Sequence, residues 1–192
     1  MDFQIPLDIW VEDLVNYILD NFQPFLDGIA AVVDGFGATI DGALLALPIW
    51  LMIALLTAFS GWRVSLRFGL FTLVALLLIV SMGLWTETIS TLGLVLASTL
   101  LSLILGVPLG VWMARSKLVE GISKTTLDFM QTMPAFVYLI PAVMFFGLGR
   151  VPGIIATVIF AMPPAVRLTA LGIQQVPVEI VEAARAFGCT DR

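Results

Sequence analysis

The stretch LVALLLIV, from Leu73 to Val80, consists of eight apolar residues in succession. Strands of an outer-membrane barrel alternate polar and apolar side chains over about ten residues, and this stretch does not alternate. It lies inside an uncharged run, 68–86, whose length approaches the roughly 20 apolar residues that a helix needs to cross a bilayer core of about 30 Å. The stretch therefore predicts a membrane-spanning helix.

The composition of the whole chain agrees with this prediction. Hydrophobic residues make up 60% and charged residues 12%, with a mean hydropathy of +1.07, whereas soluble domains carry about 25% charged residues. The uncharged or nearly uncharged runs that could serve as spans are 42–62, 68–86, 88–114, 129–149 and 151–173. We therefore expect an all-α integral membrane protein with about five transmembrane helices.

The residue inventory excludes several kinds of chemistry. Cys189 is the single cysteine and histidine is absent, which excludes an internal disulfide and any histidine-containing metal or acid–base site. The chain also lacks a Gly-x-x-x-x-Gly-Lys-Ser/Thr phosphate-binding loop. We expect no catalytic residue, no metal site and no cofactor bound by this chain, so uphill transport would draw its energy from another subunit.

Basic residues predict the orientation, because Lys and Arg collect in short cytoplasmic loops. They cluster after the first run, after the third run and after the fifth run: Arg63, Arg67, Arg115, Lys117, Lys124, Arg185 and Arg192. The two intervening loops carry Glu87 and a lone Arg150. The N-terminus is therefore expected outside the cell and segment 174–192 in the cytoplasm.

The N-terminal segment 1–41 is acidic, with eight Asp or Glu residues and no Lys or Arg. Aspartates recur at intervals of seven: Asp13, Asp20, Asp27, Asp34 and Asp41. Apolar residues follow helical spacing on other faces, which predicts an extracytoplasmic amphipathic helix interrupted at Pro24. The alternative is a solvated acidic leader without a specific role.

Helix breakers are common inside the expected spans: Pro48, Pro108, Pro134, Pro141, Pro163 and Pro164. Freed carbonyls in a bilayer need neighbouring helices or a wet cavity, which favours a bundle around a pathway over a simple anchor. Gly106 and Gly110 form a Gly-x-x-x-Gly pair that permits close helix approach. Charge within the spans is nearly absent, with Asp128 at one edge and Arg167 near another, which disfavours an ion-coupled secondary transporter.

The closing stretch predicts a short cytoplasmic helix over 177–187. Pro177 suits the first helical position and Gly188 the end. An apolar stripe with small residues lies beside a charged face, as expected of a helix that docks in a groove of another protein. The alternative is an amphipathic helix on the inner membrane surface.

Two stretches carry a family resemblance. EAARAFG, Glu182 to Gly188, resembles the Glu-Ala-Ala-x-x-x-Gly loop of permease subunits of bacterial ABC importers. MQTMPAFVYLIPAVMFFGLGRVPGIIATVIFAMPPAVRLTALGIQQVP, Met130 to Pro177, strongly resembles permeases for glycine betaine, proline betaine and related quaternary-amine osmoprotectants. In that family the loop continues beyond the glycine to further spans, so the resemblance implies that this chain is the N-terminal part of a permease.

The resemblance implies a type I importer in the bacterial inner membrane. Its partners would be a second permease copy, two cytoplasmic ATP-binding subunits that use the ATP, and an external solute-binding protein. Segment 174–192 would be an incomplete coupling loop. The residues implied in coupling to the ATPase are Glu179, Glu182, Ala183, Ala184, Arg185, Phe187 and Gly188.

Aromatic residues offer candidates for contact with the solute. A quaternary ammonium cannot donate a hydrogen bond and is held over aromatic faces by cation–π attraction. Candidates that would border the pathway are Phe136, Tyr138, Phe145, Phe146 and Phe160. The alternative for each is packing against helices or lipid. At the level of the whole chain, a channel or secondary transporter and a non-transporting membrane scaffold remain alternatives.

Overall fold

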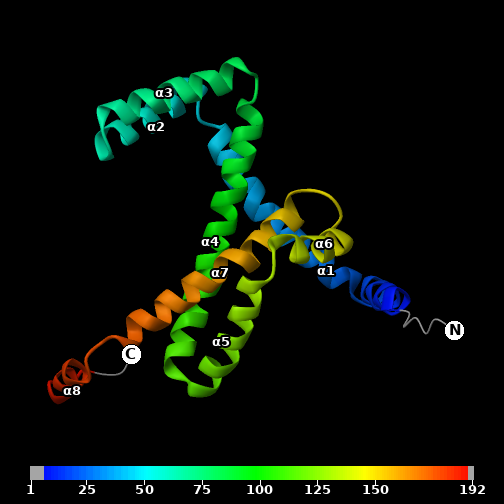
Figure 1. Ribbon diagram of the computed structural model, residues 1–192, viewed down its shortest axis with the longest axis vertical. Coiled ribbons are helices and arrows are strands. Elements are labelled where there is room, and N and C mark those ends of the chain that lie inside the picture. The colour runs from blue at the N-terminus through cyan, green and yellow to red at the C-terminus, as the bar shows by residue number, and fades with distance from the viewer. Residues whose placement is uncertain (1–6, 190–192) are drawn as a thin grey trace. The chain divides into compact units, whose positions relative to one another are not determined.

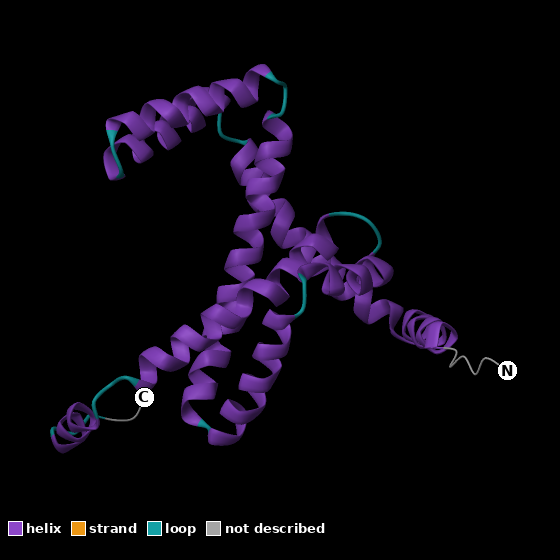
Figure 2. Cartoon of the chain, in the orientation of Figure 1, coloured by secondary structure: helices purple, strands orange, loops and turns teal. Residues whose placement is uncertain are grey.

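The computed structural model describes residues 7–189 of the chain, without the side chains of residues 7, 8, 178, 184 and 185. Eight helices follow one another over the described residues (Figure 1), and no strand occurs among them (Figure 2). Their bounds are α1 Leu7–Leu45, α2 Ile49–Arg63, α3 Leu66–Ser81, α4 Trp85–Arg115, α5 Lys117–Thr132, α6 Ala135–Phe146, α7 Arg150–Gln174 and α8 Val178–Ala186. The all-α class is confirmed.

Several of these helices have the length and apolar composition that a bilayer crossing requires. Within the described residues they are α1 from Ile9, α4 and α7, and α5 with α6 adds a fourth if this pair, bent by 94°, is one broken span. Helices α2 and α3 are apolar but shorter, with 15 and 16 residues. The chain is therefore a multi-pass membrane protein, and the number of five spans stays a prediction.

Helix α1 continues through Pro24, so the interruption expected there is wrong. A proline inside a helix removes one hydrogen bond, here the one to the carbonyl of Asp20, but its φ is close to the helical value. The neighbouring turns keep their bonds, and Asn21 Nδ2 also donates to the carbonyl of Tyr17 at 2.8 Å. The long helix includes residues 7–41 of the segment that we expected as an extracytoplasmic amphipathic helix, and residues 1–6 lie outside the described residues. By composition, α1 from Ile9 could equally cross the membrane.

Two other prolines do separate helices. The expected span 42–62 includes the end of α1, a short connection, and α2, which begins directly after Pro48. The expected span 129–149 is divided between α5 and α6 at Met133, which has the extended values φ −87° and ψ 137°. Proline disfavours helical geometry in the residue before it, which explains why Met133, just before Pro134, leaves the helix.

Helix α5 occupies a segment that the sequence analysis treated as a loop. Ser116 caps its N-terminus, since its Oγ accepts a hydrogen bond from the N–H of Val119 at 3.5 Å. One face is buried through Ser123 and Leu127, and the opposite face is exposed through Leu118 and Ile122. The helix is amphipathic, which is why a search for uncharged runs passes over it.

The described residues group into two compact units, 7–97 with 141–154 and 98–140 with 155–189. In the first unit, α2 and α3 pack side by side (Figure 1). A Cβ on Gly69 would lie 2.9 Å from the Cα of Gly61, so this hairpin depends on glycine at the contact. In the second unit, the core is the cluster of Met113, Leu127, Val166 and Ala170, from α4, α5 and α7.

Candidate functional site

Helix α8 is the segment expected to contact an ATPase, and only three residues, 175–177, separate it from the end of α7. The carbonyl of Pro177 accepts from the N–H of Ile180 at 3.1 Å, which starts the first turn. After the last turn the chain reverses at Gly188, whose φ of +84° lies in the left-handed region that favours glycine. The short helix, Val178–Ala186, therefore begins and ends within one residue of the range 177–187 that the sequence predicted.

The side chains of α8 are largely open. Ile180 is 60% exposed and Phe187, just after the helix, is 90% exposed, while Glu179, Glu182 and Ala183 are also exposed. The side chains of Ala184 and Arg185 lie outside the described residues. Ile180, Ala183 and Phe187 follow helical spacing, so an apolar stripe faces outward next to two carboxylates.

Helix α7 leads into α8 and is packed closely against α4. A Cβ on Gly110 would lie 2.6 Å from the carbonyl oxygen of Val166 and 2.7 Å from Cβ of Thr169. A Cβ on Gly106 would lie 3.0 Å from Cβ of Ala165. The Gly-x-x-x-Gly pair noted in the sequence therefore lies in a helix–helix contact that admits no larger side chain without movement.

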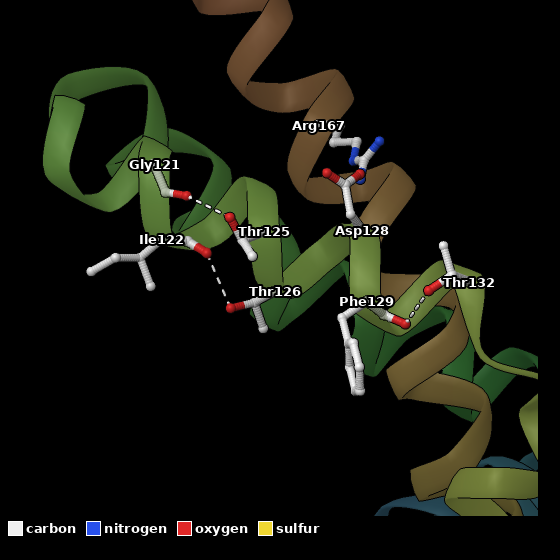
Figure 3. Close-up of polar contacts among 8 residues, drawn as sticks. All are labelled: Gly121, Ile122, Thr125, Thr126, Asp128, Phe129, Thr132 and Arg167. Atoms are coloured by element: carbon white, nitrogen blue, oxygen red, sulfur yellow. Dashed lines mark hydrogen bonds and ion pairs between the residues drawn. The ribbon is translucent and has the colours of Figure 1, made fainter.

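Polar contacts join α7 to α5. Arg167 Nη2 donates to Asp128 Oδ1, and Figure 3 shows the two side chains pointing toward each other from neighbouring helices. Near the end of α7, Gln174 Nε2 lies 3.5 Å from Glu120 Oε1. The sequence analysis noted Asp128 and Arg167 separately but did not predict that they pair.

A cavity of about 350 Å³ lies beside these contacts. Its lining residues are Met113, Lys124, Asp128, Arg167, Ala170, Leu171 and Gln174. Lys124 Nζ lies 2.8 Å from Glu120 Oε1, one helical turn earlier on α5. The hydrogen bond from Lys124, together with its positive charge, holds the pKa of Glu120 below its ordinary value. Charged groups of both signs therefore border one opening between α5 and α7.

Tyr138, a candidate for the pathway, makes hydrogen bonds that the sequence analysis did not predict. Its hydroxyl lies 3.0 Å from the carbonyl oxygen of Met130 and 3.2 Å from that of Phe129. In an unbroken helix the carbonyl of Met130 would accept from the N–H of residue 134, but Pro134 has none. Tyr138 therefore supplies a donor at the bend between α5 and α6.

The other candidate aromatic residues are exposed or half-buried. Phe136 is 74% exposed and Phe160 is 52% exposed, whereas Phe145 and Phe146 are half-buried and belong to the other unit. The ring pair found among the described residues is Phe68 with Phe71, with centroids 6.1 Å apart. Contact with a solute stays a prediction for all five candidates: Phe136, Tyr138, Phe145, Phe146 and Phe160.

In the first unit, Arg150 pairs with two members of the aspartate series of α1. Its Nη1 lies 2.8 Å from Asp41 Oδ2 and its Nε lies 3.4 Å from Asp34 Oδ1. Gly37 lies between these aspartates, and a Cβ there would lie 3.0 Å from Cδ of Arg150. The spacing of seven therefore has a structural role at its C-terminal end, which the sequence analysis did not predict.

Comparison with known proteins adds a family match. The model of the family described as "Binding-protein-dependent transport system inner membrane component" matches residues 106–192. This range includes the end of α4, both partners of the Asp128–Arg167 pair, and α8.

Individual relatives match nearly the whole chain. The glycine betaine/carnitine transport permease protein GbuB of Listeria monocytogenes is 51% identical over 97% of this chain and 67% of that relative. The glycine betaine/proline betaine transport system permease protein ProW of Escherichia coli is 43% identical over 98% of this chain and 53% of that relative. The glycine betaine transport system permease protein OpuAB of Bacillus subtilis is 44% identical over 97% of this chain and 66% of that relative.

The chain thus spans about two thirds of the length of GbuB and OpuAB and about half of ProW. The resemblance inferred from Met130 to Pro177 and from EAARAFG is confirmed by these matches.

Proposed function

The chain belongs to the family of binding-protein-dependent transport system inner membrane components, and we propose that it acts as a permease subunit of an ATP-driven importer. The substrate class that we propose is glycine betaine and related quaternary-amine osmoprotectants. Support comes from the relatives, whose names associate three permeases of 43 to 51% identity with glycine betaine. The helical, apolar architecture suits such a subunit.

The proposed assembly contains a second copy of this permease, two cytoplasmic ATP-binding subunits and an external solute-binding protein. ATP is bound and hydrolysed by the partner, and this chain contributes the membrane pathway. The family description, which names a binding-protein-dependent system, supports the external partner.

The observation that carries the ATPase contact is the exposed apolar stripe of α8. A short helix with an open stripe of Ile180, Ala183 and Phe187 would leave apolar surface in water unless another protein or the membrane surface covers it, and the two carboxylates beside the stripe favour a protein. Ala183 has room for close approach, and Glu179 and Glu182 can accept hydrogen bonds from a basic partner. The basic residues of the loops support a cytoplasmic position for α8 and an external N-terminus.

Substitutions in α8 test this proposal in the complete transporter. Ala183→Trp should hold the two surfaces apart, because overpacking a close contact costs about 1–3 kcal/mol, or roughly tenfold to hundredfold in association. Glu182→Ala should remove a charge-assisted contact at a cost of about 1.5–3 kcal/mol. Both variants should lose betaine uptake and co-purify less ATPase, while their amount in the membrane stays unchanged.

The matched control is Ala31→Trp, which places the same bulky side chain at an exposed alanine of α1. It should keep ATPase co-purification. Wild-type uptake by both α8 variants would exclude α8 as the contact with the ATPase.

A further inference from the structure

Two polar contacts, at different positions along the helices, join the C-terminal half of α7 to α5. Arg167 pairs with Asp128, and Gln174, seven residues further along α7, lies 3.5 Å from Glu120, eight residues earlier on α5. Since the numbering rises on one helix as it falls on the other, the two helices are antiparallel. Spacings of seven and eight residues each return to the same helix face after about two turns. The contacts therefore form two rungs, which we name the α5–α7 ladder: Asp128–Arg167 and Glu120–Gln174.

The Glu120–Gln174 contact, which we call the lower rung, lies where α7 meets α8. Gln174 is the last residue of α7, and only residues 175–177 separate it from the first residue of α8. Within this connection the N–H of Gln175 still donates to the carbonyl of Leu171 at 2.9 Å. A displacement of α8 therefore reaches the lower rung through very little intervening chain.

The same part of α7 is packed against α4 on another side. The glycine contacts at Gly106 and Gly110 involve residues 162–169 of α7, and Met113, Leu127, Val166 and Ala170 form one apolar cluster. These contacts resist separation of the helices and determine how α7 lies against its neighbours. The two directional polar contacts add a restraint on the register between α5 and α7 to that of the packing.

The Asp128–Arg167 contact, the upper rung, lies where separation of its two charges is costly. Arg167 lies in an apolar stretch, between Val166 and Leu168, within a helix of spanning length. A charge near a bilayer is costly unless it is paired, so parting Arg167 from Asp128 would be opposed more strongly than in water. In this structure the two side chains are 39% and 65% exposed, and such pairs add little to stability in water. The pair is thus better suited to holding alignment than to stabilising the fold.

We propose that the α5–α7 ladder is a positioning device that makes α5 follow α7 when the ATP-binding subunit moves α8. The inference rests on the proposed function and adds Asp128, Arg167, Glu120 and Gln174 as residues that connect ATP hydrolysis to solute movement. None of these four residues needs to touch the solute.

Charge exchange at the upper rung tests the inference in the complete transporter, reconstituted in vesicles with its ATP-binding and solute-binding partners. The variants are Asp128→Arg, Arg167→Asp and the double exchange, and the measured quantity is betaine taken up per ATP hydrolysed. Each single variant places like charges together, so this ratio should fall by about tenfold or more. The double exchange restores opposite charges and should recover at least about half of the wild-type ratio, since only the pairing is required.

The ratio separates positioning from a purely structural role. A variant that merely folds poorly loses uptake and ATP hydrolysis together, whereas loss of the ladder should leave ATP hydrolysis and ATPase co-purification largely intact. The matched control is Asp27→Arg, a charge reversal at an exposed aspartate of α1, which should keep the wild-type ratio.

Two results would overturn the inference: single variants with the wild-type ratio, or a double exchange that reaches the membrane in normal amount without recovery. Failure of the proposed function has a different signature, because the unaltered complex would then take up no betaine.

Discussion

The hydroxyl of Tyr138 lies 3.0 Å from the carbonyl oxygen of Met130, the acceptor that Pro134 leaves without its usual helical donor. Pro134 follows Met130 by four residues and has no N–H to donate. Tyr138, four residues further along on α6, donates to this carbonyl instead. This contact stabilises the bend of 94° between α5 and α6. The sequence analysis named Tyr138 as a candidate for contact with the solute, with packing as the alternative, and did not predict this hydrogen bond.

Replacing Tyr138 with phenylalanine tests the role of this hydroxyl. The Tyr138→Phe variant should lose about 1 kcal/mol of folding free energy, because the carbonyl of Met130 loses its donor while the ring remains. For a chain of this size the midpoint of thermal unfolding in detergent should fall by about 2–4 °C. The control is Tyr17→Phe at the other tyrosine, which is 61% exposed on α1 and should leave the midpoint unchanged. Equal midpoints for both variants would contradict this role.

The close approach of α4 and α7 predicts a strong effect at Gly110. A Gly110→Val change places Cβ 2.6 Å from the carbonyl oxygen of Val166, and relief of this overlap should cost about 1–3 kcal/mol. Thermal unfolding in detergent measures the loss. Gly121→Ala on α5 is the matched control, since no atom beyond its chain neighbours and its own helix backbone lies within 4 Å of the added Cβ. It should be neutral or stabilising by up to about 1 kcal/mol, because alanine favours a helix over glycine. Tolerance of valine at Gly110 would show that the helices are further apart.

Gly188 is expected to require a residue that accepts the left-handed conformation. At its φ of +84° a β-branched side chain is strained, so Gly188→Val should weaken ATPase co-purification through a cost of about 1–2 kcal/mol at the end of α8. Gly188→Asn should be tolerated better, since asparagine adopts this conformation more readily. We expect ATPase co-purification to decrease in the order glycine, asparagine, valine at position 188. Equal co-purification for all three would contradict a requirement for the left-handed conformation.

The single thiol provides a test of orientation. Cys189 is exposed just beyond α8, so a membrane-impermeant maleimide should label it in inverted vesicles and not in intact spheroplasts. A second chain, with Cys189→Ser and Asp27→Cys, moves the thiol to α1 and should show the reverse pattern. Labelling of Cys189 from outside would overturn the cytoplasmic position of α8.

Much of the architecture could be predicted from local composition. The expected spans 88–114 and 151–173 agree within a few residues with α4, Trp85–Arg115, and α7, Arg150–Gln174. The end of the chain was also predictable, because Pro177 and Gly188 have conformational preferences of their own. These features depend on each residue and its near neighbours in the chain.

The helix α5 could not be found in this way. Its segment carries Lys117, Glu120, Lys124 and Asp128, and a search for uncharged runs therefore assigns it to a loop. Its helical spacing becomes meaningful only when Leu127 and Ser123 face a neighbouring helix. Tertiary packing, rather than hydropathy, makes this segment part of the core.

The sequence by itself determined the helical membrane class, the family, and the position of the terminal helix, because apolar run lengths and short motifs are local properties. Only the tertiary structure decided which charges meet. Asp128 and Arg167 are 39 residues apart, and Asp41 and Arg150 are 109 residues apart. Such pairs depend on how the helices cross and rotate, which is determined by contacts like that of Gly110 with Val166. The sequence alone does not say which opposite charge a given charged residue will meet, because packing geometry selects the partner.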